Sequence, residues 1–522
     1  MALVKSIATV GGWTMMSRVL GFVRDALMAG VLGAGPAAEA FVVAFRLPNL
    51  FRRLFAEGAL NAALVPLYAK RLETEGKESA VRFGGEAAVL LVLFMLLLTV
   101  LAMAFMPFVI LALAPGFKAD GTDGVFALAV TLSTITFPYL TFMALSALLS
   151  GMLNTAGRFG AAAAAPLLLN VVLIAAMGLH LVGLAELPPA EMLAWGVFAG
   201  GVAQFGLIAW DAHRAGLLPH LPRPTLSRDV KSLLRLMGPG VISAGVSQIN
   251  TVVSTILASL LPTGAIAHLY YADRVAQLPL GVIGVAVSVA LLPLLSRQLS
   301  AGEDAAARES LNRSLEIGLL FTLPAAAALI AMPFPVVDVL FRRGEFGIGD
   351  SASTAYVLAA MAAGLPPVVL VKILSPAFFA RRDTRTPLLI AIASMAANLA
   401  LAFALMRVLG AAGIALAASL AGWGNAVLMG WILSRRGHLP LDARFRRRVP
   451  RLVLSAVVMG GLLYGGTMLA PGMVDQPFLL RAGYLAVLVA AGGALYFVLA
   501  QITGGADLRE VKRALTRRRK AS

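Results

Sequence analysis

The chain lacks cysteine and is poor in charge, above all in negative charge. The absence of cysteine excludes disulfides, thiolate metal sites and cysteine nucleophiles. Only 13% of the 522 residues are charged, although soluble domains carry about 25%. The 26 Asp and Glu residues are outnumbered by 43 Lys and Arg residues. This composition argues against a soluble protein.

In place of charge the chain carries long apolar runs, such as Ala87–Met106 and Leu388–Met406. About 20 apolar residues are enough for a helix to cross the hydrocarbon core of a bilayer. The runs predict an all-α polytopic membrane protein with about fourteen transmembrane helices. The expected spans are 7–34, 40–69, 86–113, 125–150, 160–182, 191–212, 233–260, 266–296, 314–334, 352–379, 387–407, 411–433, 451–470 and 480–502.

The distribution of basic residues indicates the orientation. With residues at span ends counted in the adjacent loop, 31 of the 43 Lys and Arg residues lie in the N-terminus, the even-numbered loops and the C-terminal tail, and five in the odd-numbered loops. The positive-inside rule then places both termini in the cytoplasm. The basic runs Arg444–Arg448 and Arg517–Lys520 are interpreted as topology determinants beside anionic headgroups, and nucleic acid is not an expected partner.

The chain also repeats itself, in three segments that recur in the same order at nearly constant spacing. The paired segments are Ala59–Leu72 with Ala286–Leu299, Ala102–Phe117 with Ala328–Phe346, and Ala147–Arg158 with Lys372–Asp383. The repeat predicts two pseudo-symmetric six-helix lobes, 1–222 and 223–440, followed by two C-terminal helices and a basic tail in 441–522. Such repeats are typical of transporters, whose substrate sites lie between the repeats.

Seven basic residues fall inside expected spans, where each costs about 2.5–3.5 kcal/mol if it faces lipid. They are Arg18, Arg24, Arg46, Arg52, Arg53, Arg274 and Lys372. Five of them lie in the first two spans, too many for snorkelling to rescue. Most of these side chains are therefore expected to face a watery cavity.

Helical spacing groups several of these side chains. Glu39, Arg46 and Arg53 are seven residues apart and share a stripe, with Asn49 one turn from both arginines. Pro48 is expected to bend this span and to free a backbone carbonyl. In the first span Arg18 and Asp25 share a face, whereas Arg24 points roughly 120° away unless the helix bends near Gly21.

The acids expected deep in the membrane are too few to neutralise these cations. They number four, Asp25, Glu39, Glu57 and Asp273. Part of the set is expected to pair internally, since buried charges tend to pair, and an arginine of the first span is the expected partner of Glu39. The surplus of positive charge predicts an anion site, and the planar guanidinium suits phosphate oxygens.

Several long strings of the sequence resemble the MurJ/MviN family of lipid II flippases, a branch of the multidrug/oligosaccharidyl-lipid/polysaccharide exporter superfamily. They are "MMSRVLGFVRDALMAGVLGAG", "EAFVVAFRLPNLFRRLFAEGALNAALVP", "APGF", "FPYL" and "YYADRVAQLPLGVIGVA". The resemblance implies a two-lobed transporter of the bacterial inner membrane. Its substrate would be undecaprenyl-pyrophosphoryl disaccharide-pentapeptide, moved to the periplasmic leaflet by alternating access for cell-wall synthesis. It also implies a groove at the last two spans for the polyprenyl tail.

Matched to family positions, Arg18, Arg24, Arg52 and Arg274 would contact the substrate or gate the lobes. The periodicity adds Glu39, Asn49, Arg53 and Arg46, and Ser17 and Asp25 complete the candidate substrate-binding set. The implied partners are lipid II, membrane lipids and the cell-wall synthesis machinery. Glu39 stands where the family has aspartate, and Gln277 where some relatives have glutamate, so an ion-pair gate between those two positions is not expected.

Other functions fit the sequence less well. A polyprenyl-phosphate membrane enzyme would need a loop bearing carboxylates, a phosphate-binding glycine loop or a metal-ligand motif, and none is evident. No catalytic residue, metal site or cofactor is therefore expected. Another exporter of the superfamily, for a different polyprenyl-linked oligosaccharide or for drugs, is the closest alternative. The energy source could be membrane potential, protons or sodium.

The partition of basic residues makes a testable prediction about topology. A cysteine introduced by Gly264→Cys should react with a membrane-impermeant thiol reagent added to intact cells, since the seventh loop is expected outside. A cysteine introduced by Ser300→Cys should stay unlabelled until the membrane is permeabilised. The reverse pattern would overturn the orientation.

Overall fold

A computed structural model describes residues 2–54, 60–118, 123–184, 186–224 and 227–507. Glu57 and the basic run Arg517–Lys520 lie outside the described residues. The regular structure of the described part is helical throughout, with one isolated bridge between Arg343 and Phe346. The all-α class is confirmed, and every expected span coincides with one or two described helices.

The Cα positions divide the chain into two compact units. Unit 1 comprises Met1–Ala267 and Arg343–Phe346, and unit 2 comprises His268–Arg342 and Gly347–Ser522. The lobes predicted from the repeat, 1–222 and 223–440, remain a prediction, because common ancestry and present-day contacts are different criteria. By contacts, the helix after residue 222 belongs with unit 1.

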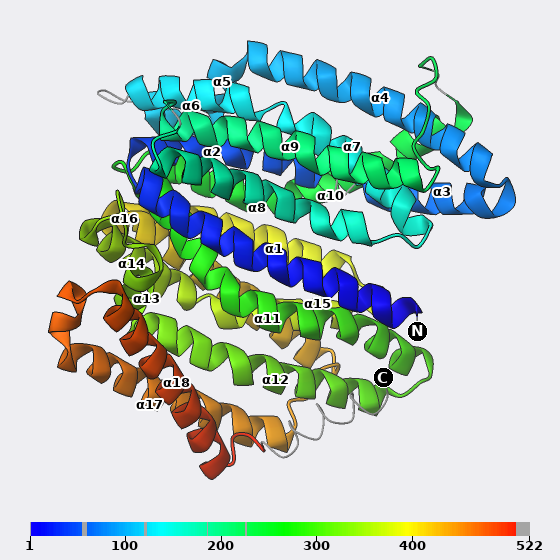
Figure 1. The fold of residues 1–522 in the computed structure, drawn as a ribbon. Helices are drawn as coiled ribbons and strands as arrows, with labels where there is room; N and C mark the ends of the chain where they lie inside the picture. Colours follow the sequence, from blue (N-terminus) through cyan, green and yellow to red (C-terminus); the bar gives the residue numbers. More distant parts are fainter. Residues whose placement is uncertain (1, 55–59, 119–122, 185, 225–226, 508–522) are drawn as a thin grey trace. The chain divides into compact units, whose positions relative to one another are not determined.

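The helices of unit 1 are α1 (Ala2–Leu32), α2 (Pro36–Phe51), α3 (Asn61–Thr74), α4 (Lys77–Ala104), α5 (Met106–Leu113), η2 (Pro115–Lys118), α6 (Asp123–Thr136), α7 (Tyr139–Thr155), α8 (Gly160–Leu181), α9 (Pro189–Arg214) and α10 (Arg228–Ser259). Within this unit α8 packs between α1 and α9, and α2 packs against α6 (Figure 1). Close approach depends on small residues. A Cβ on Gly200 of α9 would come within 2.6 Å of Leu169 Cδ1 on α8.

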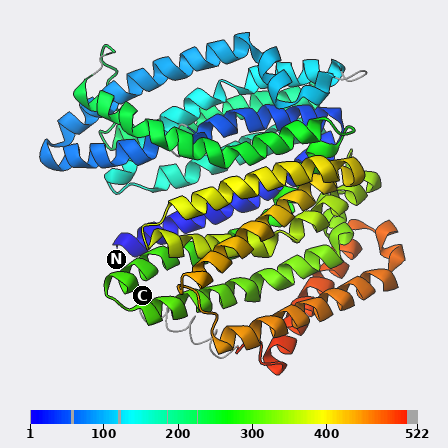
Figure 2. The same cartoon turned by 180° about the vertical axis from the view of Figure 1, so that it is seen from behind.

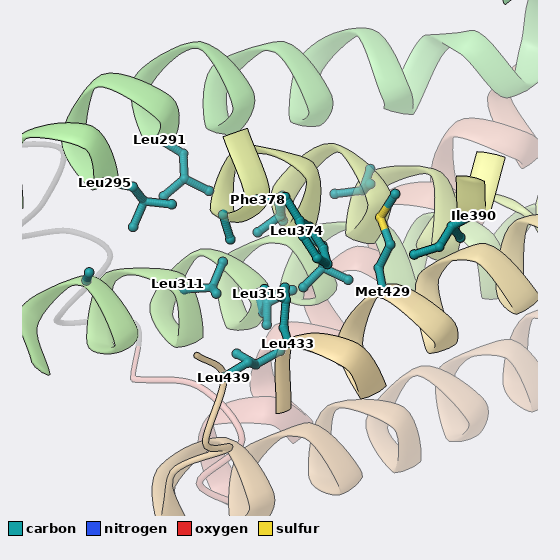
Figure 3. Close-up of a cluster of buried hydrophobic side chains, with 14 residues drawn as sticks. Leu291, Leu295, Leu311, Leu315, Leu374, Phe378, Ile390, Met429, Leu433 and Leu439 are labelled. Atoms are coloured by element: carbon teal, nitrogen blue, oxygen red, sulfur yellow. The ribbon is translucent and has the colours of Figure 1, made fainter. Parts of the chain in front are cut away.

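The helices of unit 2 are α11 (Ala265–Ser300), whose first three residues fall in unit 1, α12 (Asp304–Ala331), α13 (Pro333–Phe341), α14 (Ile348–Ala362), α15 (Leu365–Phe379), α16 (Arg385–Arg435), α17 (Ala443–Leu469), η3 (Pro471–Asp475) and α18 (Phe478–Ile502). The helix α12 packs against α15 and α17, and α17 packs against α18 (Figure 2). Buried apolar side chains of α11, α12, α15 and α16, including Leu311, Leu374 and Leu433, form one cluster (Figure 3).

Two expected spans, 387–407 and 411–433, run together as α16. The break between them survives as a kink at Gly410, whose φ of 56° and ψ of −134° are not helical. Within the described residues, nine helices or helix pairs are long and apolar enough to cross a membrane. The full number of crossings remains a prediction.

The proline inside α2 frees a backbone carbonyl, as predicted. Pro48 has no N–H for the carbonyl of Ala44, four residues earlier. That carbonyl instead accepts a hydrogen bond from Thr136 Oγ1 at the end of α6, at 3.0 Å. Beyond Pro48, residues 52–54 continue as a wider π-helical turn. A freed backbone group in an apolar environment has thus been matched by a neighbouring helix.

The turns that follow α7 and α15 support the duplication. Gly157 and Arg382 occupy matching places in the repeated segments, and both adopt left-handed backbone, with φ of 74° and 61°. After each turn an ion pair reaches the end of another helix. Arg158 pairs with Asp211 of α9, whereas Asp383 pairs with Arg436 beside α16. Both halves have an ion pair at this place, but the acidic and basic partners are exchanged between the two helix ends.

One buried carboxylate also pairs with two of the five basic residues expected in the odd-numbered loops. Asp338 of α13 is 3% exposed. Its two oxygens lie 2.8 Å from Arg342 Nε and 2.5 Å from Arg481 Nη1 of α18. Arg342 also donates to the carbonyl of Val474 in η3. The network fastens the last helix of unit 2 to α13.

Gly264 lies in left-handed backbone, with a φ of 106°. A cysteine there would be strained, because side chains rarely adopt this conformation. The neighbouring Thr263 is exposed and reports on the same loop. Thr263→Cys is therefore the better labelling position.

Candidate functional site

Arg24 is the most deeply buried of the described candidate arginines, at 9% exposure. Its Nε and Nη2 donate to Asp25 Oδ1 at 3.0 and 2.6 Å, and its Nη1 donates to Asn170 Oδ1 at 2.9 Å. The guanidinium also lies 5.6 Å from the ring centroid of Phe45 on α2. Three helices of unit 1 thus orient a single buried cation.

Asn170 was not predicted as a site residue. It lies on α8, buried, and its Nδ2 donates to the backbone carbonyl of Ser17 at 3.0 Å and lies 3.5 Å from Ser17 Oγ. One amide side chain therefore joins Ser17 and Arg24. The available signal was the asparagine itself, a strong donor and acceptor in the otherwise apolar "PLLLNVVLIAAM".

The faces expected on the first span need correction. Arg24 and Asp25 are both buried, while Arg18 is exposed. The helix α1 runs without a break through Gly21, so no interruption there reconciles the side chains. Instead the long Arg24 side chain reaches the neighbouring Asp25. The helical projection described the backbone correctly but ignored the reach of arginine.

The end of α2 presents a second group of candidates. Arg46 Nη1 donates to Thr255 Oγ1 on α10 at 3.0 Å. Arg52 Nε donates to Asn49 Oδ1 at 3.2 Å, and Asn49 Nδ2 donates to the Phe45 carbonyl at 2.7 Å. Arg53 is exposed. Asn49 was expected one turn from Arg46 and Arg53, and the described hydrogen bond joins it to Arg52 instead.

Glu39 has a different partner from the one expected. The carboxylate is 4% exposed, and its Oε1 accepts the backbone N–H of Ile266 at 2.9 Å, with the backbone of Gly264 as a second partner. An arginine of α1 is not among its described partners. Glu39 lines a cavity of about 200 Å³ with Ser259 and Pro262, among other residues. The carboxylate therefore binds the start of α11, where the helix dipole favours negative charge.

Arg274 lies in unit 2, on α11. Its Nη2 is 3.2 Å from Asp273 Oδ2, and its guanidinium lies 5.0 Å from the ring centroid of Tyr270. Gln277 also donates to Asp273. Gln277 thus binds the acid beside Arg274.

The chemistry available at these residues is that of anion binding. Between Ser17 and Leu54 there are five arginines and two acids, Asp25 and Glu39. Asp25 accepts from Arg24, and Glu39 accepts from backbone N–H groups. The hydroxyl of Thr255 and the amide of Asn49 help to orient the guanidinium groups of Arg46 and Arg52.

Solved structures identify the class to which this fold belongs. An inward-facing multidrug resistance MATE transporter of the MOP superfamily has a TM-score of 0.67 and 17% identity, covering 81% of this chain and 94% of its own. A lipid II flippase MurJ in an inward closed conformation has a TM-score of 0.77 and 25% identity, with 94% and 98% covered. The fold is that of a membrane transporter.

The sequence comparisons identify the family. The family model described as "Lipid II flippase MurJ" matches residues 28–482. A "Probable lipid II flippase MurJ" of Rhizobium meliloti (strain 1021) is 45% identical, over 100% of this chain and 98% of its own. The "Lipid II flippase MurJ" of Burkholderia cenocepacia is 34% identical, over 97% and 98%. The chain belongs to the MurJ family of lipid II flippases.

The Asn170 contacts predict a measurable loss of stability. Asn170→Ala removes partners from Arg24 Nη1 and from the Ser17 carbonyl, and should lower the free energy of unfolding by about 1–2 kcal/mol. Unfolding by denaturant in detergent micelles measures this change. Asn398→Ala is the matched control, since Asn398 is buried but its Oδ1 has no hydrogen-bond partner in the described structure. Equal losses in both variants would contradict the role of Asn170.

The Glu39 contacts predict a local effect. Glu39→Gln removes the charge that strengthens the hydrogen bonds to the start of α11, and charge-assisted hydrogen bonds contribute about 1.5–3 kcal/mol. Amide hydrogen exchange at Ile266 should accelerate by roughly tenfold or more. Glu186→Gln, at an exposed loop residue, should leave it unchanged. Unaltered exchange in the Glu39 variant would show that these hydrogen bonds do not hold the turn.

Proposed function

We propose that this protein moves lipid II, the undecaprenyl-pyrophosphoryl disaccharide-pentapeptide, from the cytoplasmic to the periplasmic leaflet for cell-wall synthesis. The observation that carries the proposal is membership of the MurJ family over residues 28–482. Alternating access is the mode of transport that suits a duplicated transporter fold. The protein acts as a transporter, without a catalytic residue, metal or cofactor.

The substrate's pyrophosphate is assigned to Arg18, Arg24, Arg52 and Arg274. The exposed Arg18 is available for first contact, and Arg24 is held in a fixed orientation by Asp25 and Asn170. A planar guanidinium can donate two parallel hydrogen bonds to phosphate oxygens. Ser17, Asp25, Arg46, Asn49 and Arg53 are assigned to orient these arginines or to add polar contacts, and Glu39 is assigned to add a polar contact beside the start of α11.

The protein is placed in the bacterial inner membrane, with both termini in the cytoplasm. The support for this orientation is the excess of basic residues in the even-numbered loops and the termini. Membrane lipids are then constant partners, and the cell-wall synthesis machinery is a further one. The basic loops then face the cytoplasmic leaflet, from which the sugars of lipid-linked precursors project into the cytoplasm.

Depletion of the protein tests the function directly. Lipid II should accumulate on the cytoplasmic leaflet, where an impermeant enzyme or label added to intact cells cannot reach it. Accumulation of another polyprenyl-linked oligosaccharide, with lipid II still exposed outside, would refute the proposed substrate.

Single arginine substitutions test the binding assignment. Alanine at Arg18, Arg24, Arg52 or Arg274 should abolish growth support at normal protein levels, while lysine should restore it only in part, because a point charge lacks the planar array of donors. Complementation of a depleted strain, with the protein quantified by immunoblot, provides the measurement. Arg407→Ala is the control, since Arg407 is exposed and stacks on Phe403. Normal growth of all four alanine variants would exclude these arginines as the pyrophosphate site.

A further inference from the structure

One end of unit 2 gathers basic side chains from three elements that are far apart in the sequence. The segment between α16 and α17 is fastened to α12, because Asn312 Nδ2 donates to the Pro440 carbonyl at 3.1 Å and Arg313 pairs with Asp442. Arg308 lies one turn before Asn312 and therefore on the same face of α12. Arg308 therefore lies on the side of α12 that faces the segment containing His438.

The turn after α15 supplies the second arginine. Arg381 is partly buried and its Nη1 donates to the Ala377 carbonyl at 2.9 Å. Ala377, Leu433 and Leu439 belong to the apolar cluster of this unit (Figure 3). The basic side chains thus border the end of an apolar core.

The acid that follows Arg381 in the sequence is already engaged by other groups. Asp383 is engaged by Arg436 at 2.6 Å and by the Thr386 N–H at 2.9 Å, and these hydrogen bonds lower the pKa of Asp383 to about 2. Within the described part of the chain, neither Arg308 nor Arg381 forms an ion pair. The Nε of Arg308 is buried without a hydrogen-bond partner.

The electrostatic environment of His438 reflects this surplus. Burial lowers the pKa of His438 from its usual value, and the positive charges of Arg381, Arg436 and Arg308 lower it further, against an opposing contribution from Asp304. Burial also lowers the pKa of Arg381, the charge of Asp304 partly opposes this, and the charge of Arg308 adds a smaller lowering. A bound anion would relieve the repulsion among all of these groups.

We propose that Arg308, Arg381 and His438 form a binding site for a phosphate group, supplied by the headgroup of an anionic phospholipid. The site lies where α12, α15 and α16 begin or end, so it is level with the headgroups if these helices span the bilayer. Phe379 and Leu441, 43% and 36% exposed, provide apolar surface nearby for the acyl chains. The two guanidinium groups bind phosphate oxygens, and the imidazole takes up a proton and donates. Affinity therefore rises as the pH falls through the pKa of His438.

The test measures the pKa of His438 by NMR in the full-length protein with labelled histidine, assigned with His438→Gln. The protein is placed in nanodiscs of phosphatidylcholine, with and without phosphatidylglycerol. Phosphatidylglycerol should raise the pKa by about 1, the size of effect that a neighbouring opposite charge produces. Inorganic phosphate added to phosphatidylcholine nanodiscs distinguishes the source. A rise with phosphate alone would retain the phosphate site but make free phosphate its ligand.

Variants separate a site from the general surface potential of an anionic bilayer. R308Q and R381Q should remove the rise, whereas R447Q, at an exposed arginine on α17, should retain it. If either glutamine variant fails to fold, R308K and R381K should give a smaller rise than the unsubstituted protein. No rise with either probe, or an equal rise in every variant, would overturn the proposal.

Discussion

A polar group inside this protein is stabilised mainly by partners within the protein, because hydrocarbon offers no hydrogen bonds. The arrangement around α1 and α2 follows from that constraint. A buried guanidinium at Arg24 requires Asp25 and Asn170, and Asn170 in turn binds the backbone of Ser17. The carbonyl released by Pro48 requires Thr136. These contacts connect α1 to α8 and α2 to α6, so the polar groups also determine which helices are neighbours.

The same constraint operates in unit 2, where it secures the helices added after the repeat. Asp338 receives Arg342 and Arg481, and Glu316 of α12 receives Arg444 and Arg448 at the start of α17. Removing one partner from such a buried pair destabilises the fold far more than replacing the whole pair by apolar residues. Two of the arginines in the basic run 444–448 thus have structural partners in addition to any effect on topology.

Sequence periodicity predicted the helices, their apolar character and the consequence of Pro48, because these depend on residues a few positions apart. It did not predict Asn170 or the backbone partner of Glu39. Those contacts join residues on different helices, and spacing along one helix gives a face but not the neighbour that the face meets. The burial of Arg24 was obscured for a related reason. A long side chain can turn through more than the angle between successive positions on a helix, so the direction of the Cβ is a poor guide to the position of the charge.

The turns after α7 and α15 show what duplication preserves. Gly157 and Arg382 keep the left-handed backbone, although only glycine adopts it without strain. The ion pairs Arg158–Asp211 and Asp383–Arg436 keep the tie between two helix ends but exchange the signs. An ion pair attracts equally well whichever helix carries the acid. Selection for a link between the two helix ends therefore does not determine which end is acidic and which is basic. The orientation of the pair does, however, affect the electrostatic potential at the neighbouring residues. In unit 2 the exchange leaves an aspartate occupied by Arg436 while Arg308 and Arg381 stay near His438 without ion pairs in the described structure. Because the exchanged pair has no net charge, the positive charge that supports the proposed phosphate site of unit 2 comes from Arg308 and Arg381 beside the pair, while the pair itself keeps Asp383 occupied.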